Sequence, residues 1–183
     1  MSGSTILREE VRRQLEAIGA ADVIVGIPSY NNASTIAHVV QAVTVGLAKY
    51  FPDQRAVLVN SDGGSTDRTR EIVAGAELGG TRAILLTQRS RSVHKVITAY
   101  QGLPGKGSAF RTVFEVAQRL GARACAVVDS DLRSITPEWI PAMLTPVLEQ
   151  EFDFVAPFYV RHKYDGTITN NVAYPLTRAL YGR

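Results

Sequence analysis

The alternation of short apolar segments with longer segments of helical periodicity constrains the fold of this chain more than any other feature. The short segments are rich in Val, Ile, Leu and Ala. Continuous apolar runs of this length are typical of strands that are buried on both faces. The pattern favours an α/β fold whose mostly parallel sheet carries helices on both faces through right-handed crossovers. The predicted strands are 23–28, 56–61, 83–87, 123–128 and 153–159.

Apolar residues at helical spacing predict one helix ahead of the sheet and further helices between its strands. Residues 1–20 are expected to form an N-terminal amphipathic helix, and residues 21–183 a single α/β domain. Residues 88–105 are expected to be a basic, irregular connector, serving either as a lid near phosphates or as a solvated loop. The other helices are predicted over 34–50, 66–77, 105–121 and 137–149, with a last short helix near the C-terminus.

The composition excludes several classes of protein. The net charge of +3, from 20 basic and 17 acidic residues, is too small to indicate nucleic-acid binding. The single cysteine, Cys125, excludes an internal disulfide and lies in an apolar run. No segment approaches the roughly 18 apolar residues of a membrane span, and the N-terminus lacks the apolar core of a secretory signal. We therefore expect a cytoplasmic protein with no membrane span and no nucleic-acid partner.

Polar residues follow three of the predicted strands at the point where each strand ends. These segments are residues 28–32 (Pro-Ser-Tyr-Asn-Asn), 60–64 (Asn-Ser-Asp-Gly-Gly) and 129–131 (Asp-Ser-Asp). In open parallel sheets, ligands bind beyond the carboxyl ends of the strands. The three segments are therefore expected to converge on one binding site.

Asp129 and Asp131 leave the fourth strand only two residues apart. Two close carboxylates repel each other unless a cation lies between them. Mg²⁺ and Mn²⁺ are suited to such a site, because hard ions take one or two carboxylates and complete their shell with water and substrate phosphates. The alternative interpretation is an ordinary acidic turn.

Two further residues are candidates for substrate binding. Asp62 could accept the imide N–H of a uracil ring, or it could serve the glycine turn alone, whereas Ser65 and Asp67 are expected only to cap the next helix. Lys106 lies between two glycines at a predicted helix start, where an anion such as a diphosphate is favoured. The alternative for Lys106 is a solvated lysine in a turn.

Four motifs, taken in order, resemble a known family. They are Ile-Pro-Ser-Tyr-Asn-Asn at 27–32, Asn-Ser-Asp-Gly-Gly-Ser-Thr-Asp-Arg-Thr at 60–69, Pro-Gly-Lys-Gly-Ser-Ala at 104–109 and Val-Val-Asp-Ser-Asp-Leu at 127–132. The set resembles the nucleotide-binding half of family-2-like GT-A glycosyltransferases, particularly the branch of glucosyl-3-phosphoglycerate and mannosylglycerate synthases. The resemblance covers about residues 22–183 and implies a Rossmann-like GT-A sheet.

The resemblance also implies roles for individual residues. Asp62 would meet the base, Lys106 the base or the diphosphate, and Asp131 would bind the metal directly. Asp129 would serve the ribose and share in the metal site. The implied substrate-binding residues are Pro28, Ser29, Tyr30, Asn32, Asp62, Lys106, Asp129 and Ser130.

The resemblance implies a metal-dependent enzyme that moves a hexose from a UDP or GDP sugar to a small acceptor such as phosphoglycerate or glycerate. The chain ends before the family's later acceptor loop and metal-binding histidine, so we expect an incomplete catalytic unit that is inactive by itself. The alternative is an ordinary helical terminus. A non-catalytic nucleotide-binding module and a sugar nucleotidyltransferase are the competing functions, although Pro28-Ser29-Tyr30 differs from the glycine-rich loop of the latter. The catalytic residue and the assembly state, a homodimer included, stay open.

Overall fold

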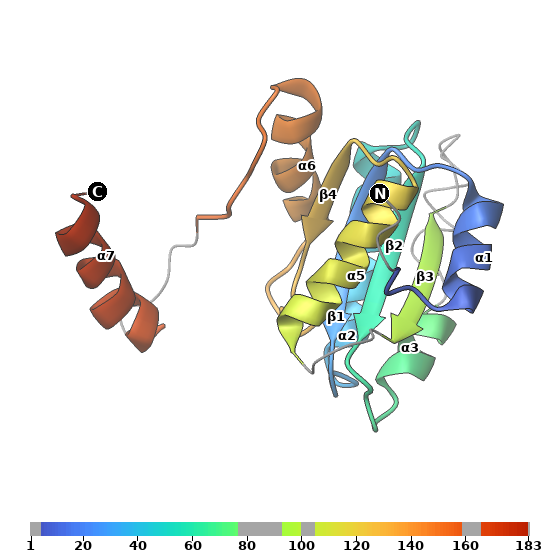
Figure 1. The fold of residues 1–183 in the computed structure, drawn as a ribbon, viewed down its shortest axis with the longest axis horizontal. Coiled ribbons are helices and arrows are strands. Elements are labelled where there is room, and N and C mark those ends of the chain that lie inside the picture. Colours follow the sequence, from blue (N-terminus) through green and yellow to red (C-terminus); the bar gives the residue numbers. More distant parts are fainter. Residues whose placement is uncertain (1–4, 77–92, 100–104, 159–165, 183) are drawn as a thin grey trace.

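The computed structural model describes residues 5–76, 93–99, 105–158 and 166–182. Its centre is a parallel sheet of strands β1 (Val23–Ser29), β2 (Ala56–Asp62), β3 (His94–Ala99) and β4 (Ala124–Val127). The strands lie in the order β3-β2-β1-β4, and every pairing between them is parallel (Figure 1). The predicted α/β fold with a mostly parallel sheet is confirmed.

Helices cover both faces of this sheet. Helices α1 and α5 pack on one face, and α2, α3 and α6 pack on the other. The helix bounds are Glu9–Ile18 (α1), Ile36–Tyr50 (α2), Thr69–Gly75 (α3), Lys106–Arg119 (α5), Trp139–Glu149 (α6) and Tyr174–Tyr181 (α7), with a π-helical turn at Thr169–Ala173 (η1).

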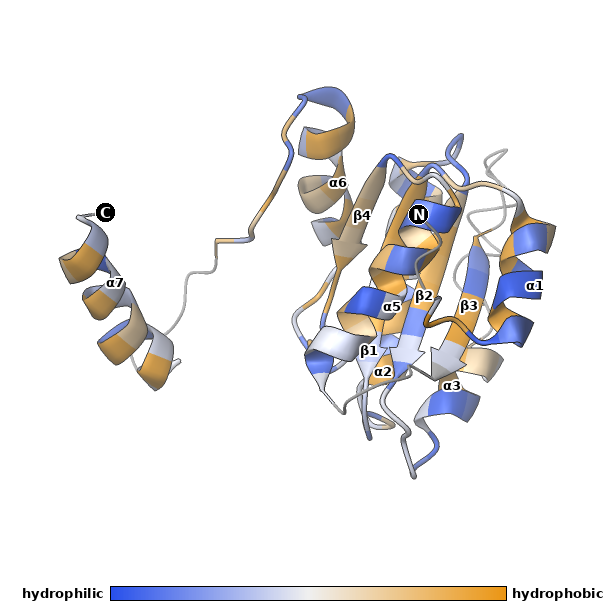
Figure 2. Ribbon diagram, viewed as in Figure 1, coloured by the Kyte–Doolittle hydropathy of each residue, from blue (hydrophilic) through white to orange (hydrophobic). Residues whose placement is uncertain are grey.

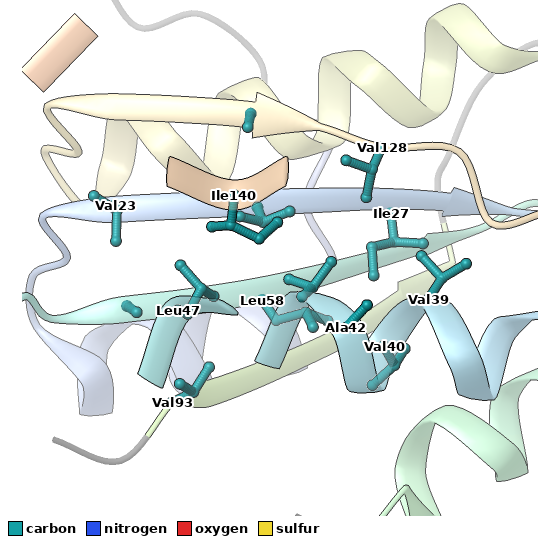
Figure 3. Close-up of a cluster of buried hydrophobic side chains, with 14 of the residues drawn as sticks. Val23, Ile27, Val39, Val40, Ala42, Leu47, Leu58, Val93, Val128 and Ile140 are labelled. Carbon is teal, nitrogen blue, oxygen red and sulfur yellow. The ribbon is translucent and has the colours of Figure 1, made fainter. Parts of the chain in front are cut away.

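Strand alternation divides the core into two apolar clusters. Val25 and Ile27 of β1 contact the cluster built on α2 and α6, whereas Ile24 belongs to the cluster built on α1 and α5. Successive side chains of a strand point to opposite faces, so one buried strand supplies both clusters. Figure 3 shows Ile140 of α6 and Leu47 of α2 beside the strands in the first cluster.

The third strand lies where the sequence predicted an irregular connector. His94–Ala99 pairs with β2 over six residues, from Val57–His94 to Asp62–Ala99. The connector prediction for this part of 88–105 is therefore wrong. The charged residue Lys95 made this segment resemble a loop in the sequence. In the structure its ammonium donates to the carbonyl of Ala76, and its neighbour Val96 is fully buried in the sheet. The predicted strand 83–87 lies outside the described residues.

Residues 153–158 do not form the predicted fifth strand. A strand requires a hydrogen-bonded neighbour, and this segment pairs with none of the strands in the described part of the chain. Phe154 is 79% exposed and Phe158 is 94% exposed, and Pro157 has no N–H to donate. The predicted strands 23–28, 56–61 and 123–128 are confirmed, with ends shifted by about one residue.

The last predicted helix is present as α7. All described residues of η1 and α7 are exposed, and apolar and polar residues alternate along the helix (Figure 2). Within the described ranges, no helix is both long and apolar enough to cross a membrane.

Gly46 allows α2 and α6 to approach each other closely. A Cβ added at Gly46 would lie 2.5 Å from Cγ1 of Ile140 and 2.7 Å from the carbonyl oxygen of Pro137. We predict that Gly46→Ala lowers the free energy of unfolding by about 1–2 kcal/mol, because the overpacking outweighs the gain in helix propensity.

Urea denaturation measures this change, with Gly75→Ala as the matched control. Gly75 ends α3, and an added Cβ there meets nothing within 4 Å. The control should be neutral or slightly stabilising. Equal stability of the two variants would show that α2 and α6 can move apart to accept the added methyl group with no loss in the free energy of unfolding.

Candidate functional site

A cavity of about 740 Å³ lies at the carboxyl edge of the sheet. It is formed by the segments that follow β1, β2 and β4 and by the first turn of α5. Because β1, β2 and β4 are parallel, their carboxyl ends open on the same edge. The lining residues are Pro28, Ser29, Tyr30, Asn32, Gly63, Gly64, Gly105, Lys106, Ala109, Asp129, Ser130 and Asp131.

All but one of the residues predicted from the sequence line this cavity. The exception is Asp62, which is fully buried beneath the turn that carries Gly63 and Gly64. Ala109 was missed by sequence reasoning, although it lies three residues after Lys106 and so faces the same side of α5. The convergence of the three strand ends is as predicted.

The Asp62 carboxylate organises the turn after β2. Its Oδ2 accepts hydrogen bonds from the backbone N–H of Gly64 and of Ser65, both at 2.9 Å. Its Oδ1 accepts from the hydroxyls of Ser65 at 2.5 Å and Ser29 at 3.2 Å. Asp62 therefore holds the shape of the turn whose residues Gly63 and Gly64 line the cavity.

Asn32 connects the loops after β1 and β4. Its Oδ1 accepts from the backbone N–H of Tyr30 and from the hydroxyl of Ser130, both at 2.8 Å. The hydroxyl of Thr35 donates to the carbonyl of Ser130 at 2.9 Å. Sequence reasoning missed Thr35, which fixes the loop that carries both site carboxylates.

Of the two residues predicted to cap α3, Ser65 and Asp67, only Asp67 accepts a hydrogen bond from an N–H of that helix among the described residues. The Ser65 hydroxyl accepts from the backbone N–H of Asn31 at 2.9 Å, so it joins the turn after β2 to the loop after β1. Asp67 accepts from the N–H of Thr69, the first residue of α3, and also from the N–H of Ala33, both at 3.0 Å. The hydroxyl of Thr69, which donates to the same carboxylate, lowers the pKa of Asp67.

Lys106 forms an ion pair with one of the two predicted metal ligands. Its Nζ lies 2.6 Å from Oδ1 of Asp129, and both side chains are about half exposed. Asp131 is exposed on the same loop and forms no ion pair with any described residue. In the described ranges, no three His, Cys, Asp or Glu side chains are grouped as a metal site.

A parallel sheet of this order, with a cavity beyond β1, β2 and β4, is typical of Rossmann-like α/β domains, the class that includes the predicted GT-A fold. Residues 24–178 match the family described as glycosyl transferase family 2. The chain therefore belongs to glycosyl transferase family 2. No curated protein sequence matches the chain significantly.

Solved structures with a similar fold come from mycobacteria. Glucosyl-3-phosphoglycerate synthase from Mycobacterium tuberculosis, in complex with Mn²⁺, UDP-glucose and phosphoglyceric acid, is 25% identical with a TM-score of 0.64. The match covers 100% of this chain and 56% of that one. A structure of the same synthase with Mn²⁺ and UDP-glucose is 25% identical over 98% of this chain and 55% of that one, also with a TM-score of 0.64.

A third structure, that of a mycobacterial protein, is 25% identical with a TM-score of 0.59. The match covers 97% of this chain and 51% of that one. The chain thus spans just over half the length of these relatives.

Of the two sequence interpretations of Asp62, its buried hydrogen bonds favour the one in which the carboxylate serves the glycine turn. We predict that Asp62→Ala lowers the free energy of unfolding by about 1–3 kcal/mol, because the N–H groups of Gly64 and Ser65 lose their acceptor. Chemical denaturation measures this loss.

Asp53→Ala is the matched control for Asp62→Ala. Asp53 is exposed in the connection before β2, and its truncation should change stability by less than about 0.5 kcal/mol. An Asp62→Ala protein as stable as this control would contradict a structural role for the four hydrogen bonds.

Proposed function

We propose that this chain binds a nucleoside diphosphate sugar, UDP- or GDP-linked, as part of a metal-dependent hexosyltransferase. The observation that carries the proposal is the single cavity that gathers Lys106, Asp129 and Asp131 beside the polar loop after β1. Membership of glycosyl transferase family 2 supports a transferase. The proposed domain is residues 21–183, preceded by the helix of residues 1–20.

The loop after β1 supplies the proposed nucleoside wall. Pro28 and Ser29 end the strand, and Tyr30, which is 61% exposed, lines the cavity beside them. Aromatic faces and backbone groups are suited to hold a base. The Asn32 amide oxygen is occupied within the protein, so its NH₂ is the group left to donate to a ligand. Asp62 would support the base through the turn that it organises.

The start of α5 supplies the proposed diphosphate wall. Gly105 has a φ of 147°, and α5 begins at the next residue, Lys106. The absence of a side chain at Gly105 and Gly107 allows phosphate oxygens to approach the backbone. N–H groups at the start of a helix favour anions, and Lys106 adds a full positive charge.

The loop after β4 has the donor chemistry for Mg²⁺ or Mn²⁺. Asp131 would bind the ion directly, while Asp129 would share in binding it and Ser130 would contact the ribose side. Carboxylate oxygens suit these hard ions, and phosphate and water oxygens would complete the shell. When bound, the ion would neutralise charge on the departing diphosphate as a Lewis acid.

The acceptor that we propose is a small molecule such as phosphoglycerate or glycerate. The support is the similarity to a synthase whose structure holds phosphoglyceric acid. We place the protein in the cytoplasm, and a homodimer is a compatible assembly.

Metal and nucleotide should strengthen each other's binding. We predict that Mn²⁺ tightens UDP binding to the wild type, measured by calorimetric titration with and without excess chelator, and by linkage that UDP tightens Mn²⁺ binding equally. Asp131→Asn keeps the side-chain shape but removes the charge, so it should abolish this coupling. Asp129→Asn should reduce it less if Asp129 mainly serves the ribose. Parallel titrations with GDP identify the base.

The matched control for these variants is Asp53→Asn, which removes a carboxylate from the connection before β2, at the opposite edge of the sheet from the cavity. It should leave the coupling intact. If the wild-type protein binds UDP equally well with Mn²⁺ and with excess chelator, residues 129–131 are an ordinary acidic turn and not a metal site.

A turnover assay separates the enzyme from a binding module. Release of hexose from UDP- or GDP-sugars, with and without phosphoglycerate, would support catalysis by this chain. Metal-coupled binding without turnover would assign it the nucleotide-binding role alone.

A further inference from the structure

We propose that the Lys106 ammonium is an exchangeable cation at Asp129. A divalent metal ion replaces it on the Asp129 carboxylate, and a bound diphosphate becomes its new anionic partner. The inference rests on the proposed function and concerns how metal and nucleotide become coupled at that site. Lys106 would thereby act as a positioning residue whose ammonium moves between two anionic partners.

The ion pair joins two walls of the cavity. Lys106 is the first residue of α5, and Asp129 follows β4, yet Nζ lies only 2.6 Å from Oδ1 of Asp129. The same ammonium lies 5.9 Å from the ring centroid of Phe110, one turn along α5. Both members of the pair line the cavity, so the pair lies where the proposed ligands must bind.

A metal ion and the Lys106 ammonium are competitors for Asp129. At the observed distance, Nζ is in direct contact with the carboxylate oxygen, and a divalent ion on the same carboxylate would repel it. Metal binding through Asp129 therefore requires Lys106 to move away. Without another anion nearby, that movement leaves a lysine facing a new positive charge.

A diphosphate at the start of α5 supplies the missing partner. Its oxygens would lie beside Gly105 and Gly107, within reach of the Lys106 side chain. Movement of the ammonium to the phosphates frees Asp129 for the metal, and arrival of the metal drives the ammonium toward the phosphates. Each ligand thus removes an obstacle to the other, which is a source of coupling in addition to direct contact between metal and phosphate.

The strength of the pair sets the size of the expected effect. Both side chains are about half exposed, with relative exposures of 57% and 46%, so solvent screens the pair. Pairs of this kind change equilibria by about two- to five-fold. Lys106→Met, which keeps most of the side-chain length without the charge, should therefore bind Mn²⁺ alone about two- to five-fold more tightly than the wild type.

The experiment titrates Mn²⁺ into wild type, Lys106→Met, Lys106→Arg and Arg133→Met, following free Mn²⁺ by electron paramagnetic resonance. Each titration is made alone, with UDP and with uridine. Arg133 is exposed two residues after Asp131, makes no ion pair with any described residue, and tests the effect of simply removing a nearby positive charge. Lys106→Arg should behave like the wild type because it keeps the competing cation.

Three results support the exchange. Lys106→Met binds Mn²⁺ alone more tightly than Arg133→Met does, UDP tightens Mn²⁺ less in Lys106→Met than in wild type, and uridine has no such effect. Unchanged Mn²⁺ affinity in Lys106→Met, or an equal gain in Arg133→Met, would overturn the exchange while leaving the proposed function standing. A wild-type protein that binds neither UDP nor Mn²⁺ would instead overturn the proposed function.

Discussion

Strand β1 is hydrogen-bonded along both edges and buried on both faces, and the position of every candidate site residue depends on that placement. Its register pairs Ser29 with Asp62 and Gly26 with Val127, which brings the carboxyl ends of three strands to one edge. Gly26 also lets α5 lie directly on β1, since a Cβ there would be 2.4 Å from Cγ1 of Val113. The same contact therefore places the first turn of α5 beside the cavity.

Two kinds of interaction build the cavity, and they differ in how easily they can change. The loops after β1 and β2 are held by hydrogen bonds to a fully buried carboxylate and to the Asn32 amide, which are costly to break. The pair between Lys106 and Asp129 is half exposed and therefore weak. The structure thus combines fixed walls, suited to a nucleoside, with exchangeable charges at the position proposed for metal and diphosphate.

Much of the fold could be predicted because strand burial and helix periodicity are local properties of the sequence. The cavity also followed from position alone, because Pro28 lies at the end of a strand, Lys106 at a helix start and Asp131 in the loop after a strand. The third strand could not be predicted in this way, since His94 and Lys95 resemble loop residues until β2 provides a hydrogen-bonded neighbour. The strand prediction for residues 153–159 failed for the opposite reason, because a strand-like composition does not supply a hydrogen-bonded neighbour.

The roles of Asp62 and Lys106 show what sequence patterns omit. Whether a carboxylate faces a ligand or its own turn depends on which N–H groups surround it, and Gly64 and Ser65 surround Asp62 only once the turn has formed. The ion pair of Lys106 joins residues more than twenty positions apart in the sequence, and their contact arises from the packing of α5 on the sheet. The Lys106 pair has no local signature, whereas the turn at Asp62 was one of two interpretations that the sequence left open.

The central claim is that the cavity at the carboxyl edge of the sheet binds a nucleoside diphosphate through a divalent metal ion. A crystal structure of this chain with UDP and Mn²⁺, with the metal located by its anomalous scattering, tests it most directly. We expect Mn²⁺ at the carboxylate of Asp131, the diphosphate beside Gly105 and Lys106, and the base next to Tyr30. Nucleotide bound elsewhere, or bound in this cavity with no metal at Asp131, would contradict it.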